Sequence, residues 1–570
     1  MTRLLAKWRL LLLCALLAIL PVALAWHLAH LQVVPGQERG YDFLQQQGQS
    51  RTLRQEKLNA YRGMITDRNG EPLAVSTPVK SIFANPQKIA VQDYPRLAKA
   101  LGITPVELQK KVGNNSDRKF VYLARKLPPH EAQKITELNV PGVGVEEEYE
   151  RYYPAGEVAS QLVGFTNIDD KGQEGMEFAL DNWLAGSAGA KHVIKDLRGN
   201  VVKDLGLKKA AIAGRDAQLS IDLRLQYIAH KALKAQVEAR GALSGSVVVL
   251  DAKTGEVLAM ANQPSFNPNN RFNVPLANLR NRAMTDLIEP GSTIKPFTVM
   301  AALQTGRYKP ETTINTSPGY LQVGSKTLKD KHDLGVIDLT TIIQKSSQIG
   351  ISKIALDLEP NSVRDILHSV GFGQTTGAGF PGEGAGVLPA HTKWQPIERA
   401  TLAFGMGMSA TPLQLAQAYL MIANEGRFQN VSLLKKDPQA QDDTKVQQVI
   451  SPKIAHQVMD MLKTVVQPGG TATKAHLEDY TTAGKTGTAH KVAAEGYAEN
   501  KYVALFAGMA PADNPEIITV VVINEPTIGS YYGGEAAAPV FAKVAQGSLH
   551  MLNVLPQAKQ QVASISNYQP

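Results

Sequence analysis

The sequence predicts an α+β protein in three parts: an N-terminal membrane helix, a mixed α/β domain, and a larger C-terminal domain of strands and helices. Three observations lead to this prediction. A basic N-terminus precedes an unbroken apolar run, residues 62–75 have the pattern of a β-hairpin, and from about residue 242 apolar strands alternate with long helical stretches. A chain of 570 residues has room for two large domains or several smaller ones.

The composition excludes several classes of protein. Apolar residues make up 44% of the chain and charged residues 19%, so a packed core is expected and extensive disorder is excluded. Cys14 is the only cysteine, which excludes an intramolecular disulfide and any cysteine-based metal centre. The net charge of +9 suits an anionic membrane, an acidic polymer or nucleic acid. Because no basic run with interleaved aromatic residues is present, nucleic acid is not expected as a partner.

The N-terminus predicts a membrane anchor. Arg3, Lys7 and Arg9 precede an apolar stretch from Leu10 to Trp26, which is at the short end of the length that spans a bilayer. The basic flank predicts an N-terminus in the cytoplasm and export of the rest of the chain. A cleaved signal peptide is the alternative, since Ala23-Leu24-Ala25 fits a signal peptidase site. Both readings place the bulk of the chain outside the cytoplasm.

The part of the chain that follows the anchor is rich in hairpins and turns. Residues 31–55 are polar and Gln-rich, which is typical of a solvated stalk or helix. Arg62–Val75 predicts two strands around Asn69-Gly70, a dipeptide typical of tight hairpins. Turn-rich stretches follow at Arg151–Gly156 and Gly172–Glu177.

The C-terminal part predicts a larger core. A helix is expected to end near Ala239, and two apolar strands follow at Ser246–Leu250 and Glu256–Met260, joined by a turn. Ile517–Ile523 is a continuous apolar run that predicts a buried strand. The polar residues 556–570 are expected to fray.

The strongest chemical signal is the segment Glu289-Pro-Gly-Ser-Thr-Ile-Lys295. Its Pro-Gly dipeptide marks a turn and a helix is expected from Phe297, so Ser292 would lie at the helix N-terminus with Lys295 one turn later. The positive end of the helix dipole favours a developing alkoxide, and a buried lysine of lowered pKa can act as the activating base. Ile294, Phe297 and Ala301 form the expected buried stripe of this helix.

Ser-x-x-Lys and Lys-Thr-Gly each occur elsewhere in the chain, so the surrounding sequence must indicate which copy of each is catalytic. Ser116/Lys119 and Ser432/Lys435 lack the turn and helix around Ser292. Lys253-Thr-Gly predicts a hairpin turn, whereas Ala483–Ala489 predicts a strand whose small residues let a substrate backbone approach. A phosphate-binding loop is excluded there, because Asp479 stands where that loop needs glycine.

The order of these motifs points to a family. Ser292 and Lys295 come first, a hydroxyl-bearing segment around Ser346 follows, and Lys485-Thr-Gly487 comes last, as in penicillin-binding proteins and serine β-lactamases. The chain resembles class B penicillin-binding proteins of the cell-division (FtsI) type, which are monofunctional peptidoglycan D,D-transpeptidases. The resemblance runs from the anchor to about residue 553. Further stretches that carry it are Tyr153–Gly156, Asn281–Asp286, Lys345–Ala355, Gly405–Gly407, Tyr531–Gly534 and Ala538–Phe541.

The resemblance implies a domain plan. Residues 1–30 would form a cytoplasmic tail and transmembrane anchor, 31–215 an elongated pedestal or dimerisation domain, 216–555 the transpeptidase domain, and 556–570 a disordered tail. The transpeptidase domain is expected to hold a five-stranded antiparallel sheet covered by helices, beside a helical subdomain. The implied location is the bacterial inner membrane, with a single span and the catalytic domain in the periplasm.

The resemblance also implies a role for each motif residue. Ser292 would attack the D-Ala–D-Ala amide of a stem peptide, with Lys295 as base. Ser346 would relay a proton between Lys295, Lys485 and the leaving amine. The backbone N–H groups of Ser292 and Thr488 would form the oxyanion hole, and an amine from a neighbouring strand would then take the acyl group. No metal or organic cofactor is expected. Substrate-binding roles fall to Gln348, Thr486, Gly487, Thr488, Tyr531 and Tyr532.

Several partners and alternatives follow from the same resemblance. β-Lactams are expected as inhibitors, and the anchor and pedestal are expected to bind a glycan polymerase of the SEDS class and other division proteins. A D,D-carboxypeptidase or a serine β-lactamase would use the same residues but pass the acyl group to water. A non-catalytic division scaffold is a further alternative. For Tyr531 and Tyr532, simple core packing competes with a place in the substrate cleft.

One position departs from the family pattern. The middle motif of the family is Ser-x-Asn, and here it is Ser346-Ser347-Gln348. Glutamine keeps the amide but places it about 1.5 Å further out, one carbon–carbon bond. We expect this amide to contact the substrate or β-lactam side chain and to help hold Lys295. The hypothesis is intact chemistry with an altered substrate or β-lactam preference, as in a specialised paralogue.

Overall fold

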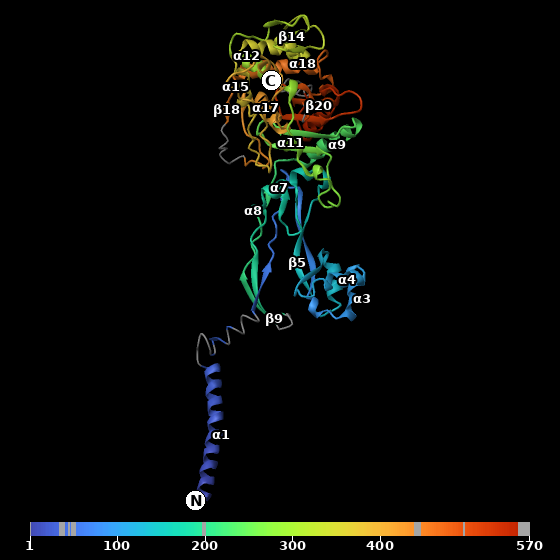
Figure 1. The fold of residues 1–570 in the computed structure, drawn as a ribbon. Helices are drawn as coiled ribbons and strands as arrows, with labels where there is room; N and C mark the ends of the chain where they lie inside the picture. Colours follow the sequence, from blue (N-terminus) through green and yellow to red (C-terminus); the bar gives the residue numbers. More distant parts are fainter. Residues whose placement is uncertain are drawn as a thin grey trace, which may run out of the picture. The chain divides into compact units, whose positions relative to one another are not determined.

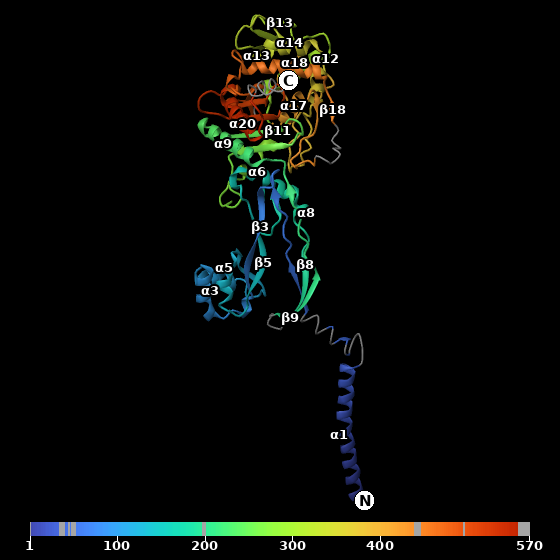
Figure 2. The same cartoon turned by 180° about the vertical axis from the view of Figure 1, so that it is seen from behind.

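The computed structural model describes residues 2–33, 40, 42–43, 46, 53–195, 201–437, 446–493 and 496–556 (Figures 1 and 2). These form two compact units, each built from separate stretches of chain. One comprises 1–61, 78–150 and 186–214, and the other 62–77, 151–185 and 215–570. The domain limits predicted from the sequence, 31–215 and 216–555, stay a prediction. Most of the predicted stalk and the tail from 557 lie outside the described residues.

The N-terminal helix α1 (Thr2–Gln32) is longer at both ends than the apolar run that predicts it. Within it, Lys7–Leu31 is a stretch of 25 residues with a mean hydropathy of 2.4, long and apolar enough to cross a membrane. The helix extends into the polar flanks because these residues also favour helical backbone and need not be apolar. Its length and composition fit a single membrane anchor.

The first unit holds two β-sheet regions and a small helical cluster. The antiparallel strands β1-β8-β9 form one sheet that pairs with no other named strand in the described residues, and β3 pairs with β4 in a second sheet. The helix α4 begins at a capping box, in which Thr104 and Glu107 satisfy each other's backbone N–H groups. Strand bounds are β1 Leu53–Leu58, β3 Pro72–Ala84, β4 Val121–Leu127, β5 Val143–Tyr152, β8 Gly189–Lys195 and β9 Val201–Lys209. The first residues of β3, 72–77, and the last of β5, 151–152, are counted with the second unit. Helix bounds are α3 Tyr94–Leu101, α4 Pro105–Gly113 and α5 Pro129–Thr136.

The second unit is built on a five-stranded antiparallel sheet in the order β12-β11-β21-β20-β19, which confirms the predicted α+β class. Its central strand β21 is buried along almost its whole length, as the continuous apolar run predicts. The predicted hairpin of β11 and β12 is also present. Strand bounds are β11 Ser244–Asp251, β12 Val257–Gln263, β19 Ala483–Ala493, β20 Gly496–Ala510 and β21 Ile517–Asn524.

Helices cover both faces of this sheet (Figures 1 and 2). Helices α9 (Leu223–Ala239) and α20 (Ala538–Met551) pack together on one face, and α17 (Pro412–Ala423) and α18 (Pro452–Val466) pack on the other. Helix α12 (Lys295–Gln304) is buried on all sides from Lys295 to Leu303. The predicted single stripe was therefore too narrow, because α12 is a core helix surrounded by other elements.

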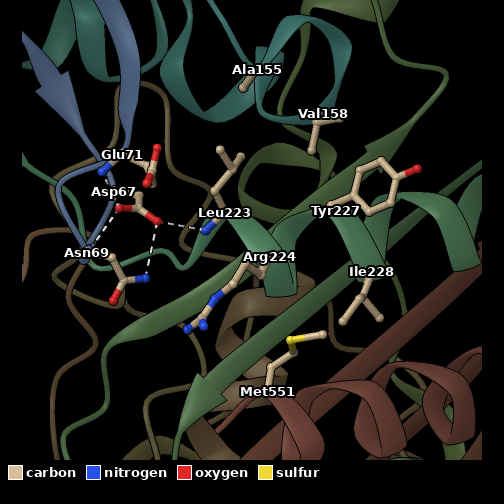
Figure 3. Close-up of a pocket in the computed structure, with 10 residues that line it drawn as sticks. All are labelled: Asp67, Asn69, Glu71, Ala155, Val158, Leu223, Arg224, Tyr227, Ile228 and Met551. Carbon is tan, nitrogen blue, oxygen red and sulfur yellow. Dashed lines mark hydrogen bonds between the residues drawn. The ribbon is translucent and has the colours of Figure 1, made fainter.

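The hairpin predicted at Arg62–Val75 is present and fixes the start of α9. Its first strand, β2 (Ile65–Thr66), is short, and Gly70 in the turn has φ of +90°. The Asp67 carboxylate accepts hydrogen bonds from the backbone N–H groups of Asn69, Glu71 and Leu223, at 2.7, 2.9 and 3.0 Å (Figure 3). The turn also lines a cavity of about 770 Å³, which none of the proposed catalytic or substrate-binding residues lines.

Candidate active site

A second cavity, of about 810 Å³, gathers the motif residues from distant parts of the chain. Of the residues singled out in the sequence, it is lined by Ser292, Ser346, Gln348, Thr486, Thr488, Tyr531 and Tyr532. Lys295 and Lys485 lie behind this wall and contact Ser346 from below the surface. All of these residues belong to the second unit.

Ser292 lies in a tight turn that leads into a buried helix. The turn Gly291–Ile294 is a 3₁₀ helix and continues directly into α12. Ser292 is half-buried, and its hydroxyl makes no hydrogen bond with the residues that the structure describes. The hydroxyl is therefore available to a molecule in the cavity.

The edge strand β19 packs tightly against the nucleophile turn at Gly487. A Cβ at this position would lie 2.9 Å from the Pro290 carbonyl oxygen and 3.0 Å from Cγ2 of Thr293. Only glycine fits this approach without moving backbone, which explains the glycine of the Lys-Thr-Gly motif. The strand is thereby placed with Thr486 and Thr488 at the cavity.

Ser346 connects the two buried lysines. It ends α13 (Leu339–Lys345) in the left-handed region, with φ of +62°, just before α14 (Gln348–Asp357). Its Oγ accepts hydrogen bonds from Nζ of Lys295 at 3.1 Å and of Lys485 at 3.0 Å. Since a hydroxyl has two acceptor lone pairs and one proton, the Ser346 proton is left to donate elsewhere. This left-handed backbone is uncommon for a residue other than glycine.

Burial shifts both lysines toward the neutral form. Lys295 is fully buried, and desolvation lowers its pKa to about 7, although the negative charge of Asp330 opposes this shift. Lys485 is also fully buried, and desolvation together with the nearby charge of Lys295 lowers its pKa well below the usual value. A neutral amine at neutral pH can accept a proton, which an ordinary lysine cannot.

The threonines of β19 have partners that orient them. The Thr486 hydroxyl shares a hydrogen bond of 2.9 Å with the Thr471 hydroxyl. Oγ1 of Thr488 accepts a hydrogen bond of 3.1 Å from the backbone N–H of Gly533. Lys485 Nζ also donates to the Thr486 carbonyl at 3.3 Å. Two hydroxyls thus lie along one edge of the cavity, with the Lys485 ammonium or amine group buried behind them.

Tyr531 and Tyr532 line the cavity and are not core residues. The Tyr531 ring stacks on Tyr502 with centroids 3.9 Å apart, and the Tyr532 ring lies 4.6 Å from that of Tyr531. Tyr532 is 47% exposed. The aromatic rings give this side of the cavity an apolar surface.

The prediction that the Gln348 amide contacts Lys295 is wrong. Lys295 Nζ donates to the carbonyl and the hydroxyl of Ser346. Within the described part of the chain, the Gln348 amide makes no hydrogen bond, while its backbone N–H donates to Asp330. The amide lines the cavity, where it can meet a ligand.

Asp330 is a site residue that the sequence did not reveal. Its carboxylate accepts hydrogen bonds from the Ser347 hydroxyl at 2.5 Å and from the backbone N–H groups of Gln348 and Ile349 at 2.6 and 3.3 Å. It therefore holds the turn that carries Ser346, and its charge acts on Lys295. No local motif marks it, because it reaches the turn only through the fold. Among the described residues, no group of His, Cys, Asp and Glu gathers that could hold a metal ion.

Comparison with known proteins agrees with this geometry. Residues 245–546 match the family described as "Penicillin binding protein transpeptidase domain", and residues 57–219 match "Penicillin-binding Protein dimerisation domain". The probable peptidoglycan D,D-transpeptidase PbpC of Pseudomonas aeruginosa is 41% identical over 565 residues, which is 99% of this chain and 98% of the relative. Peptidoglycan D,D-transpeptidase FtsI of Escherichia coli is 42% identical over 559 residues, which is 97% of this chain and 93% of the relative.

A solved structure shows the same fold. The crystal structure of penicillin-binding protein 3 from Mycobacterium tuberculosis, complexed with aztreonam, has a TM-score of 0.67 and 28% sequence identity to this chain. The match covers 88% of this chain and 98% of the other. The chain therefore belongs to the penicillin-binding proteins that join a dimerisation domain to a transpeptidase domain, which confirms the resemblance found in the sequence.

Proposed function

We propose that the protein is a membrane-anchored peptidoglycan D,D-transpeptidase that cross-links stem peptides at the division septum through an acyl-enzyme on Ser292. The observation that carries this proposal is the buried pair Lys295 and Lys485, both hydrogen bonded to Ser346 Oγ beside the Ser292 turn. The relatives named as peptidoglycan D,D-transpeptidases support the reaction, and the name FtsI of one of them fits the septum.

The acylation step follows from this arrangement. Neutral Lys295 takes the proton of the Ser292 hydroxyl as its oxygen attacks the carbonyl carbon of the D-Ala–D-Ala amide. The amide C–N bond then breaks, and the leaving D-Ala amine receives a proton through Ser346, which exchanges protons with Lys295 and Lys485. An acceptor amine attacks the resulting ester, forms the new amide and returns the proton to Ser292.

The substrate is held by the edge strand. The hydroxyls of Thr486 and Thr488 hold the terminal carboxylate of the donor, and the negative charge of that carboxylate favours the protonated form of Lys485 behind them. Gly487 permits the close approach of the strand. The backbone N–H groups of Ser292 and Thr488 stabilise the oxyanion, and the loss of one such donor typically costs about 2.7–4 kcal/mol of transition-state stabilisation. Tyr531 and Tyr532 bind the apolar part of the ligand.

Gln348 tunes ligand preference in this proposal. Its amide lines the cavity and has no protein partner among the described residues, so it is left to bind the ligand. We predict that Gln348→Asn changes the relative acylation rates of several β-lactams by a few-fold, since it withdraws the amide by one carbon–carbon bond. Stopped-flow acylation with a panel of β-lactams checks this. Identical relative rates, with unchanged turnover of the donor peptide, would contradict it.

β-Lactams are proposed as inhibitors that acylate Ser292. The related penicillin-binding protein 3 was solved in complex with aztreonam, and the two chains share the fold. Because a β-lactam presents a reactive amide to the same serine, slow release of the product would leave a stable adduct.

The location and the protein partners also belong to the proposal. The helix α1 and the basic residues before it support a single span in the bacterial inner membrane, with the catalytic unit in the periplasm. A glycan polymerase of the SEDS class and other division proteins are proposed to bind the anchor and the dimerisation domain. Co-purification of the full-length chain with such a polymerase tests that part.

Product analysis separates transpeptidation from its alternatives. Purified full-length protein is given a D-Ala–D-Ala donor peptide and an excess of an amine acceptor, and the products are identified by mass spectrometry. The proposal predicts a cross-linked product together with free D-Ala. Hydrolysed donor alone would show a D,D-carboxypeptidase, rapid β-lactam hydrolysis a β-lactamase, and no product of any kind a non-catalytic scaffold.

A further inference from the structure

The short segment Lys329–His332 brings several charged side chains to the wall of the active-site cavity. It begins at the last residue of the hairpin of β14 (Tyr320–Val323) and β15 (Lys326–Lys329), and all four of its residues line the cavity. Of these four residues, only Asp330 has a role in the site described above, where it holds the turn that carries Ser346. The two lysines and the histidine have no role in proton transfer.

Asp330 fixes this segment beside the catalytic serine. Its carboxylate accepts from Ser347 and Gln348, and its backbone N–H donates to the Gly319 carbonyl at 3.1 Å. The neighbours of Asp330 in the chain, Lys329 and Lys331, are therefore held close to the turn that carries Ser346. The two lysines therefore line the cavity because the hydrogen bonds of Asp330 hold the backbone between them.

The ammonium groups of Lys329 and Lys331 lack an acidic partner. Both side chains are exposed, and neither forms an ion pair or hydrogen bond with the described residues. Lys331 Nζ lies 5.5 Å from the ring centroid of Tyr532, an exposed aromatic residue of the cavity. His332 beside them is also exposed.

The acidic residues that line the cavity are already engaged. Asp330 is bound to the Ser347 turn, and Glu535 pairs with Lys474 at 2.6 Å. A third lysine of the wall, Lys345, donates to the Gly469 carbonyl at 2.8 Å. The cavity therefore presents two uncompensated ammonium groups, which attract an anion.

We infer that Lys329 and Lys331 bind a second carboxylate of the donor stem peptide, one that lies upstream of its D-Ala–D-Ala pair. The inference rests on the proposed function, in which the terminal carboxylate is held by the hydroxyls of Thr486 and Thr488. The protein then prefers stem peptides whose upstream carboxylate is free over peptides in which it is amidated. A carboxamide keeps the size of the group but removes the charge that the lysines attract.

Two donor peptides that differ only in this group test the inference. Both end in D-Ala–D-Ala; one carries a free carboxylate on the side chain of the preceding residue, and the other a carboxamide. For the full-length protein, kcat/KM for D-Ala release is expected to be about five- to tenfold higher with the carboxylate, since two exposed charge contacts contribute modestly each. The preference should fall as salt rises, because ions screen exposed charges.

The double variant Lys329→Met/Lys331→Met is expected to lose the preference. Its kcat/KM for the carboxamide peptide should stay within twofold of the original protein, because that peptide offers no anion to the lysines. Lys326→Met is the matched control: Lys326 lies on the same strand β15, is exposed and does not line the cavity. It should keep both rates and the preference.

The outcomes distinguish this inference from the proposed function. Equal rates for both peptides in the original protein, or a preference that survives in the double variant, would overturn the inference while leaving the transpeptidase in place. A parallel loss of both rates in the double variant would show a structural role and would also overturn it. If neither peptide releases D-Ala from the original protein, the proposed function fails and the inference falls with it.

Discussion

At the scale of single residues, the proton balance between Lys295 and Ser346 decides the reactivity of Ser292. Lys295 has a pKa of about 7 because it is desolvated, and only its neutral form can take a proton. We predict that the acylation rate rises as pH increases through about 7 and then levels off. Rates of β-lactam acylation between pH 5 and 9 check this. A rate that is flat across this range, or one that falls through pH 7, would contradict the assignment.

Asp330 is expected to set the position of that pH midpoint. Its negative charge favours the ammonium form of Lys295, so the variant Asp330→Asn should lower the pKa of Lys295 further and move the midpoint to lower pH. Asp333→Asn is the control, because Asp333 lies three residues on and binds Ser317 and Gly335, outside the Ser346 turn. If the pH midpoint shifted in both variants, or in neither, the charge of Asp330 would not be what sets the pKa of Lys295.

The sequence predicted the motif residues of the site but not the residues that hold them in position. Ser292, Lys295, Ser346 and Lys485 stand in recognisable motifs, and the structure brings them together. Asp330 was missed because its partners are backbone groups of a turn that forms only after folding. The prediction that Gln348 contacts Lys295 was wrong for the same reason. The backbone conformation of Ser346 places the Ser346 carbonyl and hydroxyl where Lys295 donates to them.

At the scale of elements, the site depends on the contact between β19 and the nucleophile turn. A Cβ at Gly487 would lie 2.9 Å from a backbone oxygen, which cannot move without moving Ser292. We predict that Gly487→Ala lowers the rate of β-lactam acylation at least tenfold and the free energy of unfolding by about 1–3 kcal/mol, the usual cost of overpacking. Acylation kinetics and urea unfolding measure the two effects.

Gly113→Ala is the matched control for that substitution. Gly113 ends α4, and a Cβ there would meet no atom within 4 Å. It should leave the acylation rate unchanged and should not lower the free energy of unfolding, because alanine at a helical position is typically stabilising by about 0.4–1 kcal/mol. If Gly487→Ala lowered neither the acylation rate nor the free energy of unfolding, the packing of β19 on the turn would not be what positions Ser292.

The elements themselves were predictable where local pattern and tertiary environment agree. The hairpin of β11 and β12, the central strand β21 and the helix α9 all follow from apolar periodicity and turn residues. Helix α12 shows the limit of this reasoning. Its sequence suggests one buried stripe, but contacts from several other elements bury all of its sides.

At the scale of the whole molecule, the chain combines a membrane helix with a catalytic unit that is complete in itself. Every residue of the proposed site lies in the second unit, although that unit is assembled from three separate stretches of chain. The order of the three motifs predicted which segments line the site, because the motifs of penicillin-binding proteins follow in the same order. That this unit is made of separate stretches of chain could not be predicted. Short segments such as 62–77 join it through long-range contacts, such as the hydrogen bond from the Leu223 backbone N–H to Asp67.

The central claim is that Ser292 is the nucleophile of a slowly deacylating transpeptidase. The most direct measurement labels the purified full-length protein with a fluorescent penicillin and identifies the labelled peptide by mass spectrometry. We predict a long-lived adduct on Ser292 that is absent in Ser292→Ala, while Ser116→Ala, which changes the serine of another Ser-x-x-Lys, keeps the label. An adduct on any other residue, rapid turnover of the penicillin, or the absence of any adduct would contradict the account.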